Sequence, residues 1–336
     1  MKKLIYFIEK SFPFNSNDLN SNIVGGSEKT LINISNQLAK LENITVKVFN
    51  NTKNKITINN VEWNNLINIK DATVPDYLIC MSDANLLSLI YCKNKFLWSH
   101  SIQSFEKFFR KGQLIPFFKY KPIVLLESNY HYINRSFITS PFGKRIIQIA
   151  VDDEFINTNV DEFFLPDKNA IFTTRSDRNL DFLLKCWEYI KIKTDNSNLF
   201  INPPYNLEEK YKKLSVKFRI KGDKSNLIKD LLNSKVMLVP GHIGEVFCLA
   251  AEEARELCLP IVTMGIGSLK ERVEHGVTGF IAKNEMEFIN YSVQLLNDNN
   301  LYFKIKNNLI KKRNSRNYKN VTKNLLNILK LKLNFI

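Results

Sequence analysis

Short apolar runs rich in Ile, Val, Leu and Phe alternate along the chain with longer segments of helical period. Within the longer segments apolar residues recur three and four positions apart, as Leu31, Ile34, Leu38 and Leu41 do, and this spacing predicts helices. Strands separated by helices form βαβ units around a mostly parallel sheet. We expect strands at 3–8, 44–49, 77–81, 95–99, 123–127 and 145–151, and a second series at 169–174, 197–202, 216–220, 236–239 and 260–264. The two series predict an α/β chain of two Rossmann-like domains, each with a doubly wound parallel sheet.

The boundary between the two predicted domains lies near Val151. The stretch 151–168, VDDEFINTNVDEFFLPDK, is acidic and poorly periodic, as a linker is. A chain of 336 residues has room for two domains of about 150 residues each. We therefore predict a first domain over 1–150, a second over 151–310, and a basic helix over 311–336 that crosses back to the first domain.

The sequence predicts a cytoplasmic protein without a membrane-spanning helix. It contains no run of about 18 apolar residues, and its first residues lead into an apolar stretch without a small-residue cleavage site. The five cysteines form no C-x-x-C pair and lie in apolar segments, so we expect buried free thiols and neither a disulfide framework nor a zinc site.

Two glycines follow the first predicted strand, in the stretch VGGSEKTL. Gly25 and Gly26 allow the backbone to approach a ligand, and the helix after them offers unpaired N–H groups and the positive end of its dipole. An ordinary helix start explains the same residues, with Ser27 as the N-cap and Glu28 in the first turn. The sequence leaves both interpretations open.

Basic side chains follow two other predicted strands, and in open α/β sheets ligands bind at the carboxyl ends of strands. His100 comes after the strand at 95–99, as either a functional or a structural histidine. Arg175 and Arg178 stand in the loop after 169–174, where two guanidiniums can bind a diphosphate and neutralise its charge as it leaves. The alternative is a solvated turn in which Asp177 balances the arginines.

Glutamates concentrate between Pro240 and Phe280 although the chain carries a net charge of +15. The apolar positions 247, 251, 254 and 258 predict a helix from Phe247, which leaves Glu245 in the preceding loop and Glu253 two turns inside the helix. Glu252 and Glu256 are four residues apart and are expected to face solvent.

A further glutamate, Glu271, follows the next predicted strand. Ser268 and Glu271 have the spacing of a capping box, so we expect Ser268 to begin a helix that Gly276 ends. A helix start at this turn would also direct N–H groups toward a ligand.

The same block resembles the carboxyl-terminal signature of retaining glycosyltransferases of family 4. In that family a Pro precedes a Glu-Gly-Phe-Gly-Leu loop, and a Glu-Ala pair, a Pro-Val-Val strand and Gly-Gly-x-x-Glu follow. The matching residues are Pro240, Glu245-Val246-Phe247-Cys248-Leu249, Glu253-Ala254, Pro260-Ile261-Val262 and Gly267-Ser268-Leu269-Lys270-Glu271. The chain departs from the pattern at Val246, Cys248 and Ser268, where the family has glycine.

The resemblance implies a GT-B architecture, in which two Rossmann-like domains face a cleft, the first domain holds the acceptor and the second binds the nucleotide-sugar. Glu245 would lie beside the donor sugar and Glu253 would bind the nucleotide ribose. His100 would approach the sugar. The diphosphate would be held by the remaining matched residues, Gly25, Gly26, Arg175, Arg178, Phe247, Cys248 and Leu249.

The resemblance further implies a retaining transfer in which the leaving phosphate takes the acceptor proton. No Asp-x-Asp follows a predicted strand, and arginines with helix N-termini can stabilise a departing diphosphate. We therefore expect metal-independent catalysis, with a nucleotide-diphosphate sugar as co-substrate and no bound cofactor. The acceptor is expected to be a saccharide or a lipid-linked saccharide, in the synthesis of a cell-surface polysaccharide or glycolipid.

Two basic segments could contact an anionic surface. Residues 105–121 interleave five basic residues with five Phe, which suits a protein lying on anionic lipid at the inner face of the membrane, and residues 301–336 carry ten Lys or Arg and no acid. Solvated faces are the ordinary alternative. Nucleic-acid binding is not expected, because no recognised motif or stacking platform accompanies the charge.

Two other functions remain open: a GT-B nucleotide-sugar epimerase or phosphorylase, and a catalytically weak, basic protein that binds membranes or polyanions. A nicotinamide dehydrogenase is disfavoured because no G-x-G-x-x-G follows the first strand. The base, the donor sugar, the acceptor, the linkage and the oligomeric state depend on residues scattered over loops, and the motifs do not specify them.

Overall fold

The computed structural model describes residues 2–21, 23–203, 205–220 and 222–331. The chain divides into two compact units, one formed by Met1–Ala150 with Tyr318–Ile336 and the other by Val151–Asn317. Within the described residues, no helix is both long enough and apolar enough to cross a membrane.

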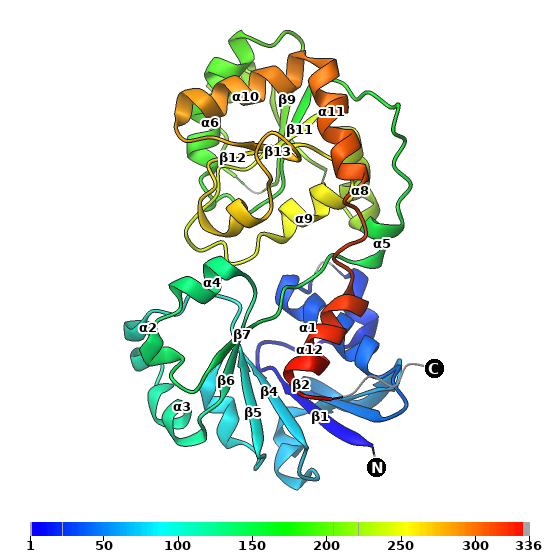
Figure 1. Ribbon diagram of the computed structural model, residues 1–336, viewed down its shortest axis with the longest axis vertical. Helices are drawn as coiled ribbons and strands as arrows, with labels where there is room; N and C mark the ends of the chain where they lie inside the picture. The colour runs from blue at the N-terminus through cyan, green and yellow to red at the C-terminus, as the bar shows by residue number, and fades with distance from the viewer. Residues whose placement is uncertain (1, 22, 204, 221, 332–336) are drawn as a thin grey trace. The chain divides into compact units, whose positions relative to one another are not determined.

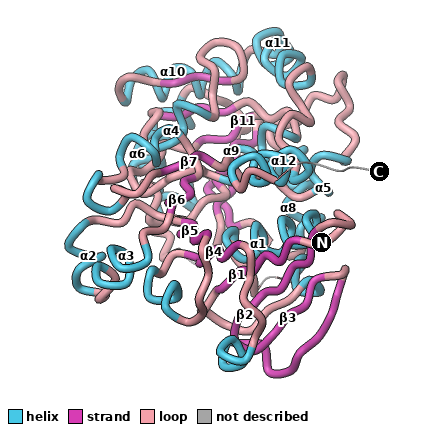
Figure 2. The backbone as a smooth tube through the Cα atoms, turned by 60° about the horizontal axis from the view of Figure 1, so that its bottom comes forward, coloured by secondary structure: helices cyan, strands magenta, loops and turns pink. Residues whose placement is uncertain are grey.

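The first unit is built on a seven-stranded parallel sheet with strand order β3-β2-β1-β4-β5-β6-β7. The chain runs outward from β1 to β2 and β3 and then returns to place β4 on the other side of β1. The order in which strands are added therefore reverses between β1 and β4. Figure 2 shows β1, β2 and β3 side by side. The strands are β1 (Lys3–Ile8), β2 (Ile44–Ile58), β3 (Val61–Asn65), β4 (Tyr77–Met81), β5 (Asn94–Trp98), β6 (Ile123–Leu126) and β7 (Lys144–Ile146).

The helices of the first unit include one from the far end of the chain, because α12 packs on α1 (Figure 1). The hydroxyls of Thr30 on α1 and Tyr318 on α12 lie 3.4 Å apart. The α-helices are α1 (Gly26–Leu38), α2 (Phe105–Arg110), α3 (Leu114–Tyr120), α4 (Asn129–Asn134) and α12 (Tyr318–Ile328). The 3-10 helices are η1 (Ser16–Asn20), η2 (Leu66–Asp71), η3 (Ala84–Ser88) and η4 (Phe137–Thr139).

The second unit has a six-stranded parallel sheet with strand order β10-β9-β8-β11-β12-β13. Its strands are β8 (Asn169–Phe172), β9 (Asn198–Ile201), β10 (Val216–Phe218), β11 (Val236–Leu238), β12 (Ile261–Thr263) and β13 (Gly279–Ile281). Its helices are α5 (Asp153–Asn157), α6 (Leu180–Ile192), α7 (Glu209–Lys213), α8 (Lys224–Leu232), α9 (Leu249–Glu256), η5 (Gly267–Glu271), α10 (Glu285–Asn297) and α11 (Asn299–Ile310).

The inner strands β8, β11 and β12 of the second sheet are buried on both faces, which explains why they are largely apolar runs. Phe172 and Leu238 pack into one apolar cluster, while their neighbours Ile171 and Met237 pack into another. Alternate residues of a strand therefore enter opposite cores. The predicted fold class, an α/β chain with two doubly wound parallel sheets, is confirmed.

The predicted strands match the observed ones in position, although several observed strands are shorter than predicted and β2 continues beyond 49 to Ile58. The strand expected at 145–151 ends at Ile146. β3 and β13 were not predicted. The basic helix expected over 311–336 begins at Tyr318, residues 311–317 belong to the second unit, and its last five residues lie outside the described part of the chain.

Candidate functional site

Three loops of the second unit meet at the carboxyl edge of its sheet, because β8, β11 and β12 are neighbours. Arg178, from the loop between β8 and α6, forms an ion pair with Glu245, from the loop between β11 and α9. Its Nε lies 2.7 Å from Glu245 Oε1, and the two side chains are only 18% and 14% exposed. Arg178 Nη1 also lies 2.8 Å from His242 Nδ1. The structure thus brings together two residues that the sequence placed in separate motifs.

Glycines allow this contact to form. A Cβ on Gly244 would lie 2.8 Å from Arg178 Nη1, and a Cβ on Gly267 would lie 2.5 Å from His242 O and 2.9 Å from Glu245 O. Gly267 also has a φ of +73°, which favours glycine. The backbone N–H of Ser268 donates to Glu245 O at 2.9 Å, so the η5 segment supports the loop that carries Glu245.

The helix after this loop begins at Leu249, two residues later than the sequence predicted. Phe247 and Cys248 are buried, and Cys248 adopts a left-handed φ of +61° immediately before the helix. A glycine at this position would avoid that strain, which is a physical reason for the glycine in the signature that this block resembles. The N–H of Ala251 donates to Cys248 O at 3.2 Å, and the N–H groups before it, at the positive end of the helix dipole, face the end of α9 where an anion can bind. Glu253 lies within α9 and is half-buried.

Arg175 does not join the ion pair of Arg178 and Glu245. Its side chain is 77% exposed and donates to Asp177 Oδ2 at 2.7 Å. It lines a cavity of about 410 Å³ at the carboxyl ends of β8 and β9. The other lining residues are Thr173, Thr174, Ser176, Asp177, Asn202 and Pro203.

The prediction that Glu252 and Glu256 face solvent is wrong. Glu252 is 1% exposed and Glu256 is fully buried. Glu252 pairs with Arg272 at 2.8 Å and also contacts Arg316, while Glu256 pairs with Arg255 at 3.0 Å. The partner arginines come from three separate segments, which helical periodicity within α9 does not reveal.

The capping box predicted at Ser268 and Glu271 is also wrong. The segment forms the 3-10 helix η5, its N-cap is Ile266, and no side chain caps it. The left-handed turn at Gly267 and the close approach to the Glu245 loop determine the local backbone instead.

In the first unit, the glycine turn begins α1. Gly25 is the N-cap, and the carboxylate of Glu28 accepts hydrogen bonds from Gly25 N at 3.1 Å and from Ser27 Oγ at 3.0 Å. The alternative interpretation, in which Ser27 is the N-cap, is therefore wrong about the capping residue. Gly25 and Gly26 are exposed at the start of a 13-residue helix.

His100 follows β5, as predicted, and contacts a carboxylate that sequence reasoning missed. Its Nδ1 lies within hydrogen-bonding distance of Glu127 Oε1, and Glu127 follows the neighbouring strand β6. The imidazole stacks on Trp98 with ring centroids 5.5 Å apart. The pKa of nearby His131 is lowered to about 4 because burial disfavours its charged form.

A cavity of about 440 Å³ lies at the carboxyl ends of β1 and β4, where the strand order of the first sheet reverses. Its lining is polar and balanced in charge, with two acids and two lysines. The lining residues are Glu9, Lys10, Ser11, Met81, Ser82, Asp83, Asn85, Lys111 and Gln113. In open α/β sheets this position is the usual ligand site.

Residues 164–312 match the family model of glycosyl transferases group 1. Sucrose-phosphate synthase from Thermosynechococcus elongatus has a similar structure, with a TM-score of 0.71 at 12% identity over 98% of both chains. Anabaena HepE with UDP-glucose gives 0.70 at 15% identity over 97% of this chain and 99% of HepE. WaaG, a glycosyltransferase of lipopolysaccharide biosynthesis, gives 0.66 at 12% over 97% and 99%.

The fold is GT-B. No curated protein sequence matches the chain. The family match falls on the unit of this GT-B chain that contains Arg178 and Glu245, while the structural similarity extends over both units.

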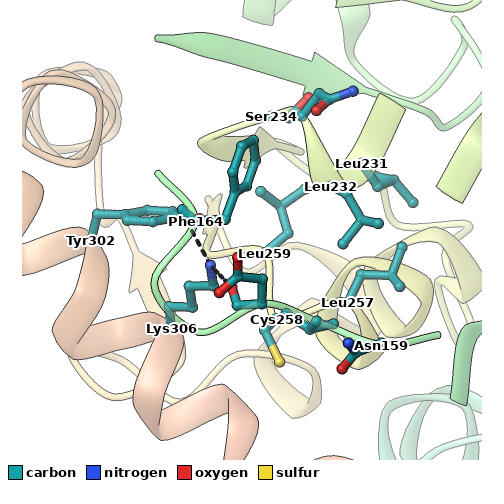
Figure 3. Close-up of a pocket in the computed structure, with 13 residues that line it drawn as sticks. Asn159, Phe164, Leu231, Leu232, Ser234, Leu257, Cys258, Leu259, Tyr302 and Lys306 are labelled. Carbon is teal, nitrogen blue, oxygen red and sulfur yellow. Dashed lines mark hydrogen bonds between the residues drawn. The ribbon is translucent and has the colours of Figure 1, made fainter. Parts of the chain in front are cut away.

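Among the described residues, no group of three His, Cys, Asp or Glu side chains could hold a metal ion. A cavity of about 200 Å³ lies before β11 and β12, at the amino end of the sheet (Figure 3). The Glu245 loop follows β11 at the opposite, carboxyl end. Lys306 at its edge donates to Asp161 O and Phe164 O at 2.7 and 2.8 Å, so it anchors the segment over the cavity.

Proposed function

We propose that the protein is a glycosyltransferase that moves a sugar from a nucleotide-diphosphate donor to an acceptor with retention of configuration and without a metal ion. The observation that supports this proposal most directly is the ion pair of Arg178 and Glu245 beside the start of α9. It places a guanidinium, a carboxylate and the N-terminus of a helix at one edge of the sheet. The presence of UDP-glucose in the similar HepE structure supports a nucleotide-sugar donor.

Each group has a task in this proposal. Arg178 and the N–H groups at Leu249 bind the diphosphate and stabilise the charge that develops as it leaves. Glu245 stabilises the oxocarbenium-like sugar, and Glu253 binds the ribose. Arg178 is already held by Glu245, so the guanidinium is in position before the donor arrives.

The transfer balances without a protein base. The bond between the anomeric carbon and the diphosphate oxygen breaks, and a bond forms from the acceptor oxygen to that carbon on the same face. The acceptor proton moves to an oxygen of the leaving diphosphate.

The acceptor, in this proposal, is a saccharide or a lipid-linked saccharide that binds the polar cavity of the first unit. A balanced lining of acids, lysines and amides suits the hydroxyls of a neutral sugar. The involvement of the similar WaaG in lipopolysaccharide biosynthesis supports a role in cell-surface polysaccharide or glycolipid synthesis.

A membrane contact belongs to the same proposal, with the protein cytoplasmic and peripheral at the inner face. On α2 and α3, Phe109 is 68% exposed and Ile115 is 80% exposed. We use the name α2–α3 patch for a set of eight exposed residues. They are Phe105, Phe109, Arg110, Lys111, Ile115, Phe118, Lys119 and Lys121. Exposed apolar side chains among cations suit an anionic lipid surface.

The test is ligand binding by purified protein in the presence of EDTA. Thermal shift against UDP, GDP, ADP and their sugars identifies the base, and calorimetry gives the affinity. Arg178→Ala should weaken binding about 10- to 100-fold, because a charge-assisted hydrogen bond contributes about 1.5–3 kcal/mol. Lys185→Ala, at an exposed lysine of α6, is the matched control and should change affinity less than about threefold. The absence of stabilisation by every nucleotide would contradict the proposal.

The alternatives make different predictions. An epimerase or phosphorylase would turn over the nucleotide-sugar without a saccharide or lipid acceptor. A polyanion-binding protein would need basic side chains in 301–336 that are available to a ligand. Several of those side chains instead bind groups of the second unit. Lys306 and Arg313 donate to backbone carbonyls, Lys312 pairs with Glu274, and Arg316 contacts Glu252.

A further inference from the structure

His100 and Glu127 lie side by side because of the register between β5 and β6. Trp98 on β5 pairs with Leu125 on β6, so the residues two positions after this pair, His100 and Glu127, are brought opposite one another. Their side chains are 13% and 4% exposed, so the contact between Nδ1 and Oε1 is shielded from water. A shielded hydrogen bond to a carboxylate is stronger than a solvated one.

The surroundings hold this pair in place. The ring of His100 stacks on Trp98. Behind the carboxylate, Glu127 N donates to His131 Nδ1 at 3.4 Å, and His131 Nε2 donates to Ser101 O at 3.1 Å. Arg135 Nη1 lies 3.4 Å from Ser99 Oγ. The segment 99–101 is therefore fixed to α4 and its flanking residues, and the imidazole has little freedom to turn.

The contact with Glu127 determines which nitrogen of His100 carries the proton. An ionised carboxylate only accepts hydrogen bonds, so Nδ1 must donate, and in the neutral ring Nε2 is then an acceptor. Among the described residues, this Nε2 is buried and has no hydrogen-bond partner. An unpaired buried polar atom costs about 1–3 kcal/mol, and a ligand hydroxyl can supply the missing partner.

We propose that Glu127 is a positioning residue, which holds His100 in the Nδ1–H tautomer so that Nε2 accepts a hydrogen bond from a hydroxyl of the reacting saccharide. The inference rests on the proposed function for the identity of the ligand. The tautomer itself is a property of the free protein.

The first experiment therefore needs no substrate. Nuclear magnetic resonance of protein labelled with ¹⁵N-histidine reports which ring nitrogen is protonated. We expect His100 to be protonated at Nδ1 and His131 at Nε2 in the same spectrum. Glu127→Gln should lower the fraction of His100 rings that are protonated at Nδ1. Glu42→Gln, at an exposed glutamate of the same unit, should leave that fraction unchanged. A His100 ring protonated at Nε2 in the unmodified protein overturns the inference.

The second experiment asks whether Glu127 acts through His100. Glu127→Gln should lower kcat about 10- to 100-fold with UDP affinity unchanged, because a lost orienting partner reduces catalysis in that range. In a His100→Gln background the same change should have less than a twofold further effect. A merely structural role predicts equal losses in both backgrounds, and that result overturns the inference. Glu127→Asp keeps the carboxylate and should retain part of the turnover.

The two arms separate this inference from the proposed function. A protein that binds no nucleotide but shows the Nδ1–H tautomer contradicts the proposed function alone. A protein that transfers sugar but shows additive losses contradicts the role of Glu127 alone.

Discussion

The buried carboxylate of Glu252 gives the prediction with the largest expected effect. It faces Arg272, which is 0% exposed at its side chain, as well as Arg255 and Arg316. The Arg272 guanidinium also lies over the Phe247 ring, 4.3 Å from its centroid, in the proposed diphosphate loop. Glu252→Gln keeps the volume of the side chain and removes its charge, so Arg272 loses its closest counter-ion.

The magnitude follows from burial. Removing one partner of a buried ion pair costs about 3–5 kcal/mol because the remaining charge is left uncompensated. This is a large share of the ~5–15 kcal/mol that stabilises a typical domain. With a urea dependence of ~2–3 kcal/mol per molar, the midpoint of unfolding should fall by roughly 1 to 2.5 M.

Urea denaturation combined with hydrogen exchange of peptides from α9 measures this change in the second unit itself. Asp195→Asn is the control, since Asp195 is an exposed acid of the same unit, and it should change stability by less than about 0.5 kcal/mol. If Glu252→Gln changes stability as little as this control does, the buried network does not stabilise the unit and our reasoning fails.

Three further predictions concern other sites. Cys248→Gly relieves a left-handed φ but removes a buried side chain, so the free energy of unfolding should change by less than about 1 kcal/mol in urea titrations, and a loss above about 2 kcal/mol would contradict this balance. The pKa of His131 is lowered to about 4, below its unfolded value of about 6.5, so the unfolded state binds the extra proton. Stability should therefore fall by up to about 3 kcal/mol as the pH falls from about 6.5 to about 4, and His131→Gln should remove that loss in denaturation curves measured across this pH range. In the α2–α3 patch, Phe109→Ser with Ile115→Ser should reduce co-sedimentation with phosphatidylglycerol vesicles several-fold and leave the weak binding to phosphatidylcholine unchanged, and equal binding by both proteins would refute the membrane contact.

The fold could be predicted because parallel strands buried on both faces are apolar runs that stand out from the sequence. Strand β4 occupies the residues expected for it. Strands β3 and β13 were missed because polar or glycine residues interrupt their apolar pattern, as in VEWNN and GFI. Their place in the sheet depends on pairing with a neighbour, which the local sequence does not reveal.

The candidate site was predictable where a motif carried it and not where distant residues complete it. Glu245 and Arg178 were each visible after a strand, but their contact comes from the adjacency of β8 and β11. Glu127 follows its strand without any motif, and only the register of β5 and β6 connects it to His100. The ligand-binding and catalytic roles of all the candidate site residues stay predictions.

The packing of α12 on α1 determines which fragments of the protein can be expressed as complete units. Residues 151–317 are one uninterrupted stretch with a complete sheet, so a gene fragment for them encodes every residue of the proposed donor site in that unit. A chain stopped at Ala150 is not the other half, because it lacks α12, whose Tyr318, Leu325 and Leu326 are buried. The first unit therefore needs two stretches that lie far apart in the sequence, and a stop codon just before Tyr318 would damage a unit whose sheet is complete by β7.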